Sequence, residues 1–253
     1  TLYKGMLWCV GCIHVISISG PKSRNILKAA NCSLDVANES FEFMSFKDGT
    51  IDEVPVRIFR ISFTGELSFE INTPARYGMQ LWKILFKAGK EFGLTPYGTE
   101  AMHVLRAERG FIIVGQETDG SVSPYDLGMD WIISKKKNDF IGKRSLERLS
   151  MRSNNRKELV GLLSDDPNQV IPEGAHAIET DDLDSPDKNI LGHVTSSYYS
   201  PNCRRGIAMA LLKDGRSRKG SKVSLPLLNG EIVEAKVVNP IFFDPNGVRK
   251  NGI

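Results

Sequence analysis

Residues 62–71 read SFTGELSFEI, a tight turn followed by a strand in which apolar and polar side chains alternate. A period of two puts the polar residues of this strand on one face, with Glu70 between Ser68 and Asn72. The other face carries only apolar side chains, namely Leu67, Phe69 and Ile71. Because the apolar face belongs on a hydrophobic core, Glu70 points either into solvent or into a polar cavity.

The carboxylate of Glu70 has two interpretations, and the pattern alone leaves both open. It is either an ordinary exposed carboxylate of a strand, as most glutamates are, or a group that recognises a ligand. Two carboxylate oxygens in one plane match a flat heterocycle that presents an N–H beside an exocyclic amino group. Pterins carry such a pair.

Strands and helices alternate around this stretch. We expect strands over residues 13–18, 42–46 and 54–63, with a turn at 47–50. Helices are expected from Pro21 through Ala30, from Pro74 to about Phe92, and over 99–109. The second of these has one apolar stripe, which we assign to the core: Met79, Trp82, Leu85, Phe86 and Gly89. The pattern predicts an α+β domain with helices on one sheet face.

The composition and periodicity of the sequence change after about Asp130. Basic runs and a polar stretch over 151–157 are typical of a solvated linker. Short strand-like runs follow without helical periodicity, at 159–163, 191–196, 206–212, 222–228 and 232–238. This spacing predicts a small antiparallel β-barrel or sandwich. We therefore expect two domains, over residues 1–150 and 158–253.

Composition excludes several classes of protein. The chain has 253 residues, of which 41% are hydrophobic and 25% charged, as in ordinary globular proteins. Its net charge of +3 does not indicate a nucleic-acid partner. Because no apolar run approaches the roughly 20 residues of a membrane helix, we expect no membrane partner and a cytoplasmic location.

Motifs of metal and nucleotide sites are also missing. The spacing of Cys9 and Cys12 suits a redox or zinc site, but Cys32 and Cys203 are isolated and provide no second pair. We therefore expect no metal. The chain contains no glycine-rich dinucleotide fingerprint, phosphate loop or nucleophile elbow.

Four separate motifs resemble one known family. FTGELSFE at residues 63–70 is similar to the YTGExGFE signature of the glycine-cleavage T-protein (aminomethyltransferase) family, which binds tetrahydrofolate. Three further stretches are most similar to one branch of this family, the carboxy-terminal folate-binding part of the heterotetrameric sarcosine oxidase alpha subunit. These are PYGTEAMHVLRAERG at 96–110, VGQETD at 114–119 and GHVTSSYYSP at 192–201. The resemblance covers nearly the whole chain, from about Val15 to about Arg249.

The resemblance implies a set of folate-binding residues. The family glutamate that holds the pterin edge corresponds to Glu70, and a tyrosine that lines the pterin corresponds to Phe63. A phenylalanine still stacks on a flat ring but loses the hydroxyl. Phe111 corresponds to a further lining aromatic residue. Trp131 lies in the family's Gly-x-x-Trp strand, where a purely structural role is an equal alternative.

Two departures from the family pattern bear on catalysis. Met102 stands where T-proteins that act alone carry an arginine that pairs with the folate tail. The acidic residue near folate N5 belongs to a family segment upstream of Thr1, so the folate-binding domain is expected to be truncated at its N-terminus. The catalytic residue is therefore unknown from this sequence.

The resemblance implies a role in one-carbon metabolism. We expect a sarcosine oxidase complex, an oxidoreductase acting on CH–NH donors, in which FAD, FMN and NAD are held by other parts. This region would bind tetrahydrofolate and capture the one-carbon unit of oxidised sarcosine as 5,10-methylenetetrahydrofolate. The alternatives are an aminomethyltransferase of glycine cleavage that acts alone, and a non-catalytic folate-binding module.

Overall fold

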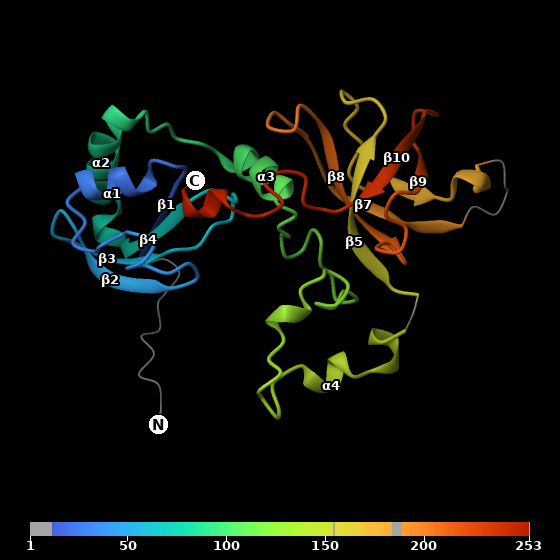
Figure 1. Ribbon diagram of the computed structural model, residues 1–253, viewed down its shortest axis with the longest axis horizontal. Coiled ribbons are helices and arrows are strands. Elements are labelled where there is room, and N and C mark those ends of the chain that lie inside the picture. The colour runs from blue at the N-terminus through green and yellow to red at the C-terminus, as the bar shows by residue number, and fades with distance from the viewer. Residues whose placement is uncertain (1–11, 154, 184–188, 253) are drawn as a thin grey trace. The chain divides into compact units, whose positions relative to one another are not determined.

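The computed structural model describes residues 12–153, 155–183 and 189–252, so Cys9 lies outside the described part. Contacts divide the chain into two compact units (Figure 1). Unit 1 combines the residues up to Met102 with Asn246–Ile253, and unit 2 comprises His103–Pro245. Each unit is described by itself below.

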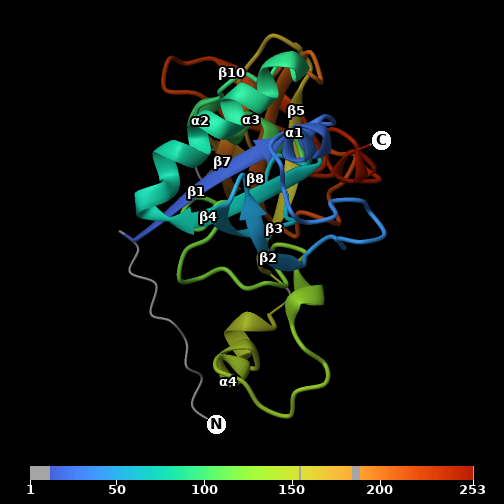
Figure 2. The same ribbon diagram turned by 90° about the vertical axis from the view of Figure 1, so that its left-hand side faces the viewer.

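Unit 1 contains a four-stranded antiparallel sheet with the order β1-β4-β3-β2 (Figure 2). In chain order the strands are β1 (Ile13–Ser19), β2 (Phe46–Ile51), β3 (Val54–Phe59) and β4 (Ser68–Pro74). Helix α1 (Ser23–Ala29) follows β1, and α2 (Gly78–Gly89) follows β4. Strand β1 is therefore at one edge of the described sheet, and it pairs with β4, the last strand of the unit in sequence.

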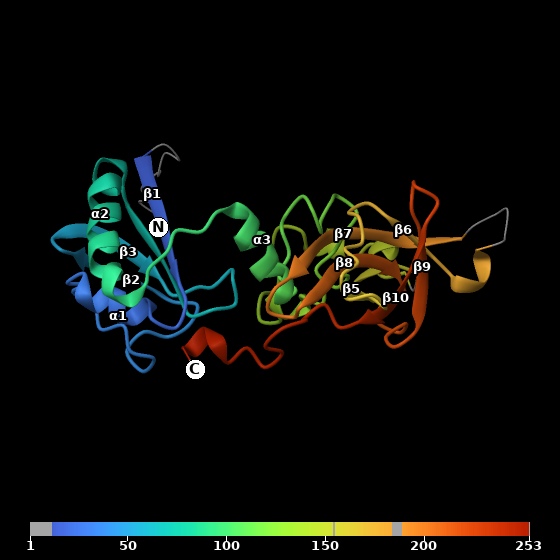
Figure 3. The same ribbon diagram turned by 90° about the horizontal axis from the view of Figure 1, so that it is seen from above.

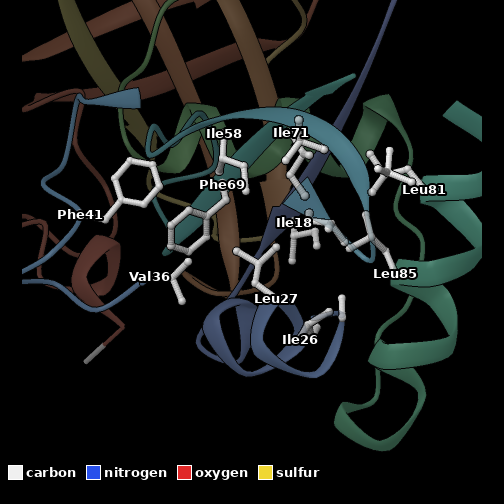
Figure 4. Packing of buried hydrophobic residues seen from close by; sticks show 14 of the residues in the cluster. Ile18, Ile26, Leu27, Val36, Phe41, Ile58, Phe69, Ile71, Leu81 and Leu85 are labelled. Atoms are coloured by element: carbon white, nitrogen blue, oxygen red, sulfur yellow. The ribbon is translucent and has the colours of Figure 1, made fainter. Parts of the chain in front are cut away.

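The core of unit 1 lies between the sheet and these two helices (Figure 4). Phe69 and Ile71 of β4 are fully buried. They pack in one cluster with Leu27 of α1 and with Leu81 and Leu85 of α2. The alternation predicted for residues 67–71 is thus confirmed, and the face that carries Glu70 points away from both helices.

The hairpin between β2 and β3 corrects the predicted strand over 42–46 and the predicted turn over 47–50. The turn is at Asp52 and Glu53, which both have positive φ, 46° and 67°. Two consecutive residues with positive φ form the tight hairpin turn that matches strand twist. Gly49 lies inside β2, where a Cβ would come within 2.8 Å of the Leu34 side chain. This glycine permits close packing and does not mark a turn.

Helix α2 also corrects two predictions. The helical segment ends as expected, because α2 leads into the 3₁₀ turn Lys90–Phe92 and then into Gly93, which has the left-handed conformation of a C-terminal cap. Its start was predicted too early, since Pro74 belongs to β4 and α2 begins at Gly78 after a 3₁₀ turn. Its buried residues, however, are Gly78, Leu81, Leu85 and Gly89. Met79 and Trp82 are 65% and 44% exposed, so the predicted stripe is rotated toward solvent.

Unit 2 is built on a closed antiparallel barrel of six strands in the order β10-β5-β8-β7-β6-β9 (Figure 3). They are β5 (Lys157–Ser164), β6 (His176–Ile178), β7 (Ile190–Ser200), β8 (Arg205–Lys213), β9 (Lys222–Pro226) and β10 (Ile232–Val238). The predicted barrel is confirmed, while the short β6 was not expected.

Helix α3 (Thr99–Glu108) runs from unit 1 into unit 2, and most of residues 109–156 form loops, with one short helix, α4 (Lys143–Leu146). Ala107 at the end of α3 packs on the outer surface of the barrel with Leu159, Met209 and Leu211. Within the described ranges no helix has both the length and the apolar composition needed to cross a bilayer.

Candidate functional site

The face of the unit 1 sheet opposite α1 and α2 carries Glu70 at its centre. We call it the polar face. In register, Glu70 of β4 lies opposite Ser17 of β1 on one side and opposite Phe59 of β3 on the other. Opposite side chains in antiparallel strands project to the same face, with Cβ atoms roughly 4.5–5.5 Å apart. The carboxylate is thus flanked by a hydroxyl and an aromatic ring.

The side chain of Glu70 is half-buried and has no hydrogen bond or ion pair with any residue that the structure describes. Burial removes water from the carboxylate and raises the pKa of Glu70 above its usual range. Carboxylates that lose water normally gain hydrogen-bond donors from the protein. Glu70 has no such donor among the described residues, so a ligand with N–H groups would stabilise its charged form.

An aromatic pair forms the apolar part of the polar face. The rings of Phe59 and Phe46 have centroids 5.4 Å apart, and Phe46 is 54% exposed. The Arg57 guanidinium lies 4.9 Å from the Phe46 ring centroid and forms a salt bridge of 2.7 Å with Asp48. An exposed aromatic surface next to a carboxylate is suited to a flat polar heterocycle.

On the other side of Glu70, four hydroxyl groups lie close together. We call Ser17, Ser19, Ser68 and Tyr97 the hydroxyl row. The Ser19 and Ser68 oxygens are 2.8 Å apart, and Ser19 lies 3.3 Å from the Tyr97 hydroxyl. The row offers donors and acceptors without charge.

A cavity of about 510 Å³ adjoins this row at the outer edge of β1. Apolar side chains of α2, including Met79, Trp82 and Phe86, line it. Ser17 and Ser19 also border the cavity, but Glu70 does not. Glu70 therefore lies outside this cavity, and its carboxylate has no partner among the described residues.

The four predicted folate-binding residues are distributed over both units. Glu70 and Phe63 belong to unit 1, where Phe63 is half-buried in the turn after β3. Phe111 is half-buried in unit 2, and Trp131 in that unit is 69% exposed. The assignment of all four residues to folate remains a prediction.

Sequence reasoning missed Phe59 and Ser17, the two cross-strand neighbours of Glu70. Alternation within 13–19 and 54–59 could have placed them on the polar strand faces. Their position beside Glu70 depends on β4 lying between β1 and β3, a pairing that no local signal specifies. In the part of the chain with described placement, no three His, Cys, Asp or Glu side chains are grouped to hold a metal ion.

Two family models match the two halves of the chain. The model of the GCVT N-terminal domain matches residues 10–137. The model of the glycine cleavage T-protein C-terminal barrel domain matches residues 157–244. Residues 103–137 thus belong to the first family domain although they pack with the barrel in unit 2. The predicted division at 150–158 remains a proposal.

Curated relatives include sarcosine oxidase alpha subunits, aminomethyltransferases and a dimethylglycine dehydrogenase. The chain is 46% identical over 242 residues to the sarcosine oxidase subunit alpha of Corynebacterium sp. (strain U-96), covering 95% of this chain and 25% of the relative. It is 31% identical over 225 residues to an aminomethyltransferase of Halothermothrix orenii, covering 87% of this chain and 59% of the relative. The chain therefore spans about a quarter of the length of the sarcosine oxidase subunits that it matches.

A solved structure shares the fold. The glycine cleavage system aminomethyltransferase T from Bartonella henselae superposes with a TM-score of 0.76 and 24% sequence identity. The match covers 92% of this chain and 60% of that one. This likeness shows the fold, and the two family models show that the chain belongs to the glycine cleavage T-protein family.

Proposed function

We propose that this chain is the tetrahydrofolate-binding region of a sarcosine oxidase alpha subunit. The 46% identity to such a subunit supports this branch over the aminomethyltransferases, which match at 31%. The observation that carries the proposal is the half-buried Glu70 carboxylate without a described partner. A pterin provides the N–H and amino donors that this carboxylate lacks.

The residues of the polar face fit a bound pterin. Glu70 would accept hydrogen bonds from the N3–H and the 2-amino group, while Phe59 and Phe46 would provide the apolar surface beside the ring. When bound, tetrahydrofolate supplies the nitrogen that captures the one-carbon unit of oxidised sarcosine as 5,10-methylenetetrahydrofolate. The protein contributes orientation, and shielding of the reactive carbon from water.

The oxidation step is assigned to partners. We propose that FAD, FMN and NAD are held by other parts of a hetero-oligomeric complex, with the flavin that oxidises sarcosine on another subunit. We also propose a cytoplasmic location, since the described cysteines Cys12, Cys32 and Cys203 are free thiols, as is usual in a reducing compartment.

Turnover measurements test this division of labour. The purified 253-residue chain is expected to show no sarcosine oxidation and no aminomethyl transfer by itself. With an added flavin-bearing sarcosine oxidase subunit and tetrahydrofolate, the one-carbon product should appear as 5,10-methylenetetrahydrofolate and not as free formaldehyde. Aminomethyl transfer by the isolated chain would instead favour the aminomethyltransferase function. Folinic acid binding without any one-carbon capture would favour a non-catalytic folate-binding module.

A further inference from the structure

Ser17 is the residue of the hydroxyl row that lies directly opposite Glu70 in the sheet. Its hydroxyl lies 3.3 Å from that of Ser68, which is two residues from Glu70 on the same face of β4. Cross-strand neighbours project side by side from an antiparallel sheet. A ligand bound to Glu70 therefore has the Ser17 hydroxyl within reach on the β1 side.

The hydroxyl of Ser17 is more available to a ligand than those of Ser19 and Ser68. Its two hydroxyl neighbours, Ser19 and Ser68, are 3.4 Å and 3.3 Å away, beyond the usual length of a hydrogen bond between hydroxyls. Ser19 and Ser68 are closer to each other, at 2.8 Å. Ser17 is also exposed and borders the cavity at the edge of β1. Its proton is thus free to turn toward a ligand.

The two cross-strand neighbours of Glu70 differ in their ability to donate a hydrogen bond, and this difference determines how a bound pterin is oriented. A pterin that places N3–H and the 2-amino group on Glu70 carries its 4-oxo oxygen next to N3. That oxygen is an acceptor and is repelled by the carboxylate unless a donor lies beside it. Ser17 can donate, whereas Phe59 on the opposite side cannot. The 4-oxo group therefore belongs on the β1 side.

We propose that Ser17 recognises the 4-oxo oxygen of the pterin and makes the site selective for 2-amino-4-oxo over 2,4-diamino pteridines. This inference rests on the proposed folate function of Glu70. A 2,4-diamino ring has an amino donor in place of the oxygen and no proton on N3, so it does not present the same edge to Glu70 and Ser17.

Titration calorimetry with two ligands tests the role of Ser17 on the full chain. Folinic acid presents the 4-oxo edge, and methotrexate presents the 2,4-diamino edge. Ser17→Ala should weaken folinic acid binding about threefold to tenfold, the loss of one neutral hydrogen bond. Methotrexate affinity should change by less than about twofold, since it makes no such bond. Ser17→Thr, which keeps the hydroxyl on a strand, should retain folinic acid affinity.

Ser40→Ala is the matched control, because it removes a serine hydroxyl that donates to Asp35 in the loop before β2 and belongs neither to the polar face nor to the hydroxyl row. It should leave the preference for folinic acid unchanged. If Ser17→Ala binds folinic acid as tightly as the wild type, or weakens both ligands equally, the proposal for Ser17 is wrong. Glu70→Ala distinguishes failure of the Ser17 proposal from failure of the folate site itself. If Glu70→Ala weakens folinic acid binding and Ser17→Ala does not, the folate site is retained without Ser17. If neither substitution changes the affinity, both proposals fail.

Discussion

Replacing Arg106 by alanine is expected to destabilise unit 2 by about 3–5 kcal/mol, because it leaves a buried carboxylate without its counterion. Arg106 and Glu117 form a salt bridge of 3.0 Å, and both side chains are fully buried. Arg106 also donates to the Ser196 hydroxyl of β7 at 2.6 Å and to the carbonyl of Phe111 at 3.0 Å. The ion pair thereby joins α3, the loop after it and the barrel.

Urea unfolding followed by circular dichroism measures this loss, as a shift of the unit 2 transition to lower urea. Lys222→Ala is the control, since Lys222 makes an equally direct ion pair with Asp165 at the surface of the same unit, and its removal should leave the midpoint nearly unchanged. Replacing Arg106 and Glu117 together by methionine and leucine should recover much of the stability. An unfolding midpoint of Arg106→Ala equal to that of the wild type would contradict the assigned role of the pair.

Replacing Glu70 by alanine is expected to weaken folinic acid binding by roughly 1.5–3 kcal/mol, the range for hydrogen bonds to a charged group. Glu70 is the one carboxylate on the polar strand face of β4, and it is half-buried without a described partner. The fold should be unaffected, because the substitution removes a desolvated charge and opens no core cavity. Glu91→Ala, at an exposed position of the same unit, serves as the control and should bind folinic acid as the wild type does.

Local sequence patterns predicted much of the secondary structure and burial of unit 1. The alternation over residues 67–71 predicted which face of β4 is buried, and the glycine after α2 predicted where that helical segment ends. The β2–β3 hairpin was misplaced, because Asp52 and Glu53 adopt positive φ without a glycine to signal the turn. The exposed Met79 and Trp82 show that an apolar stripe identifies a helix but not which of its residues are covered.

The candidate site was only partly predictable, for a different reason. Glu70 could be identified within its own strand, since its polar face is a property of local alternation. Ser17 and Phe59 became part of the site only through the strand order β1-β4-β3, which joins residues distant in sequence. Likewise, Arg106 looked like an ordinary helical residue, and its role depends on contacts with Glu117 and Ser196 made in the folded unit.

The most direct test of the folate site is the pH dependence of folinic acid binding to the wild type and to Glu70→Gln. The pKa of Glu70 is raised in the free protein, and the ligand donors favour the charged carboxylate. Affinity should therefore be constant above that raised pKa and should fall as pH decreases through it, by about tenfold per pH unit once the carboxyl is protonated. Glu70→Gln should bind more weakly and show no such decrease. An identical pH profile for both proteins, measured where circular dichroism shows both folded, would contradict the central claim that Glu70 holds the pterin.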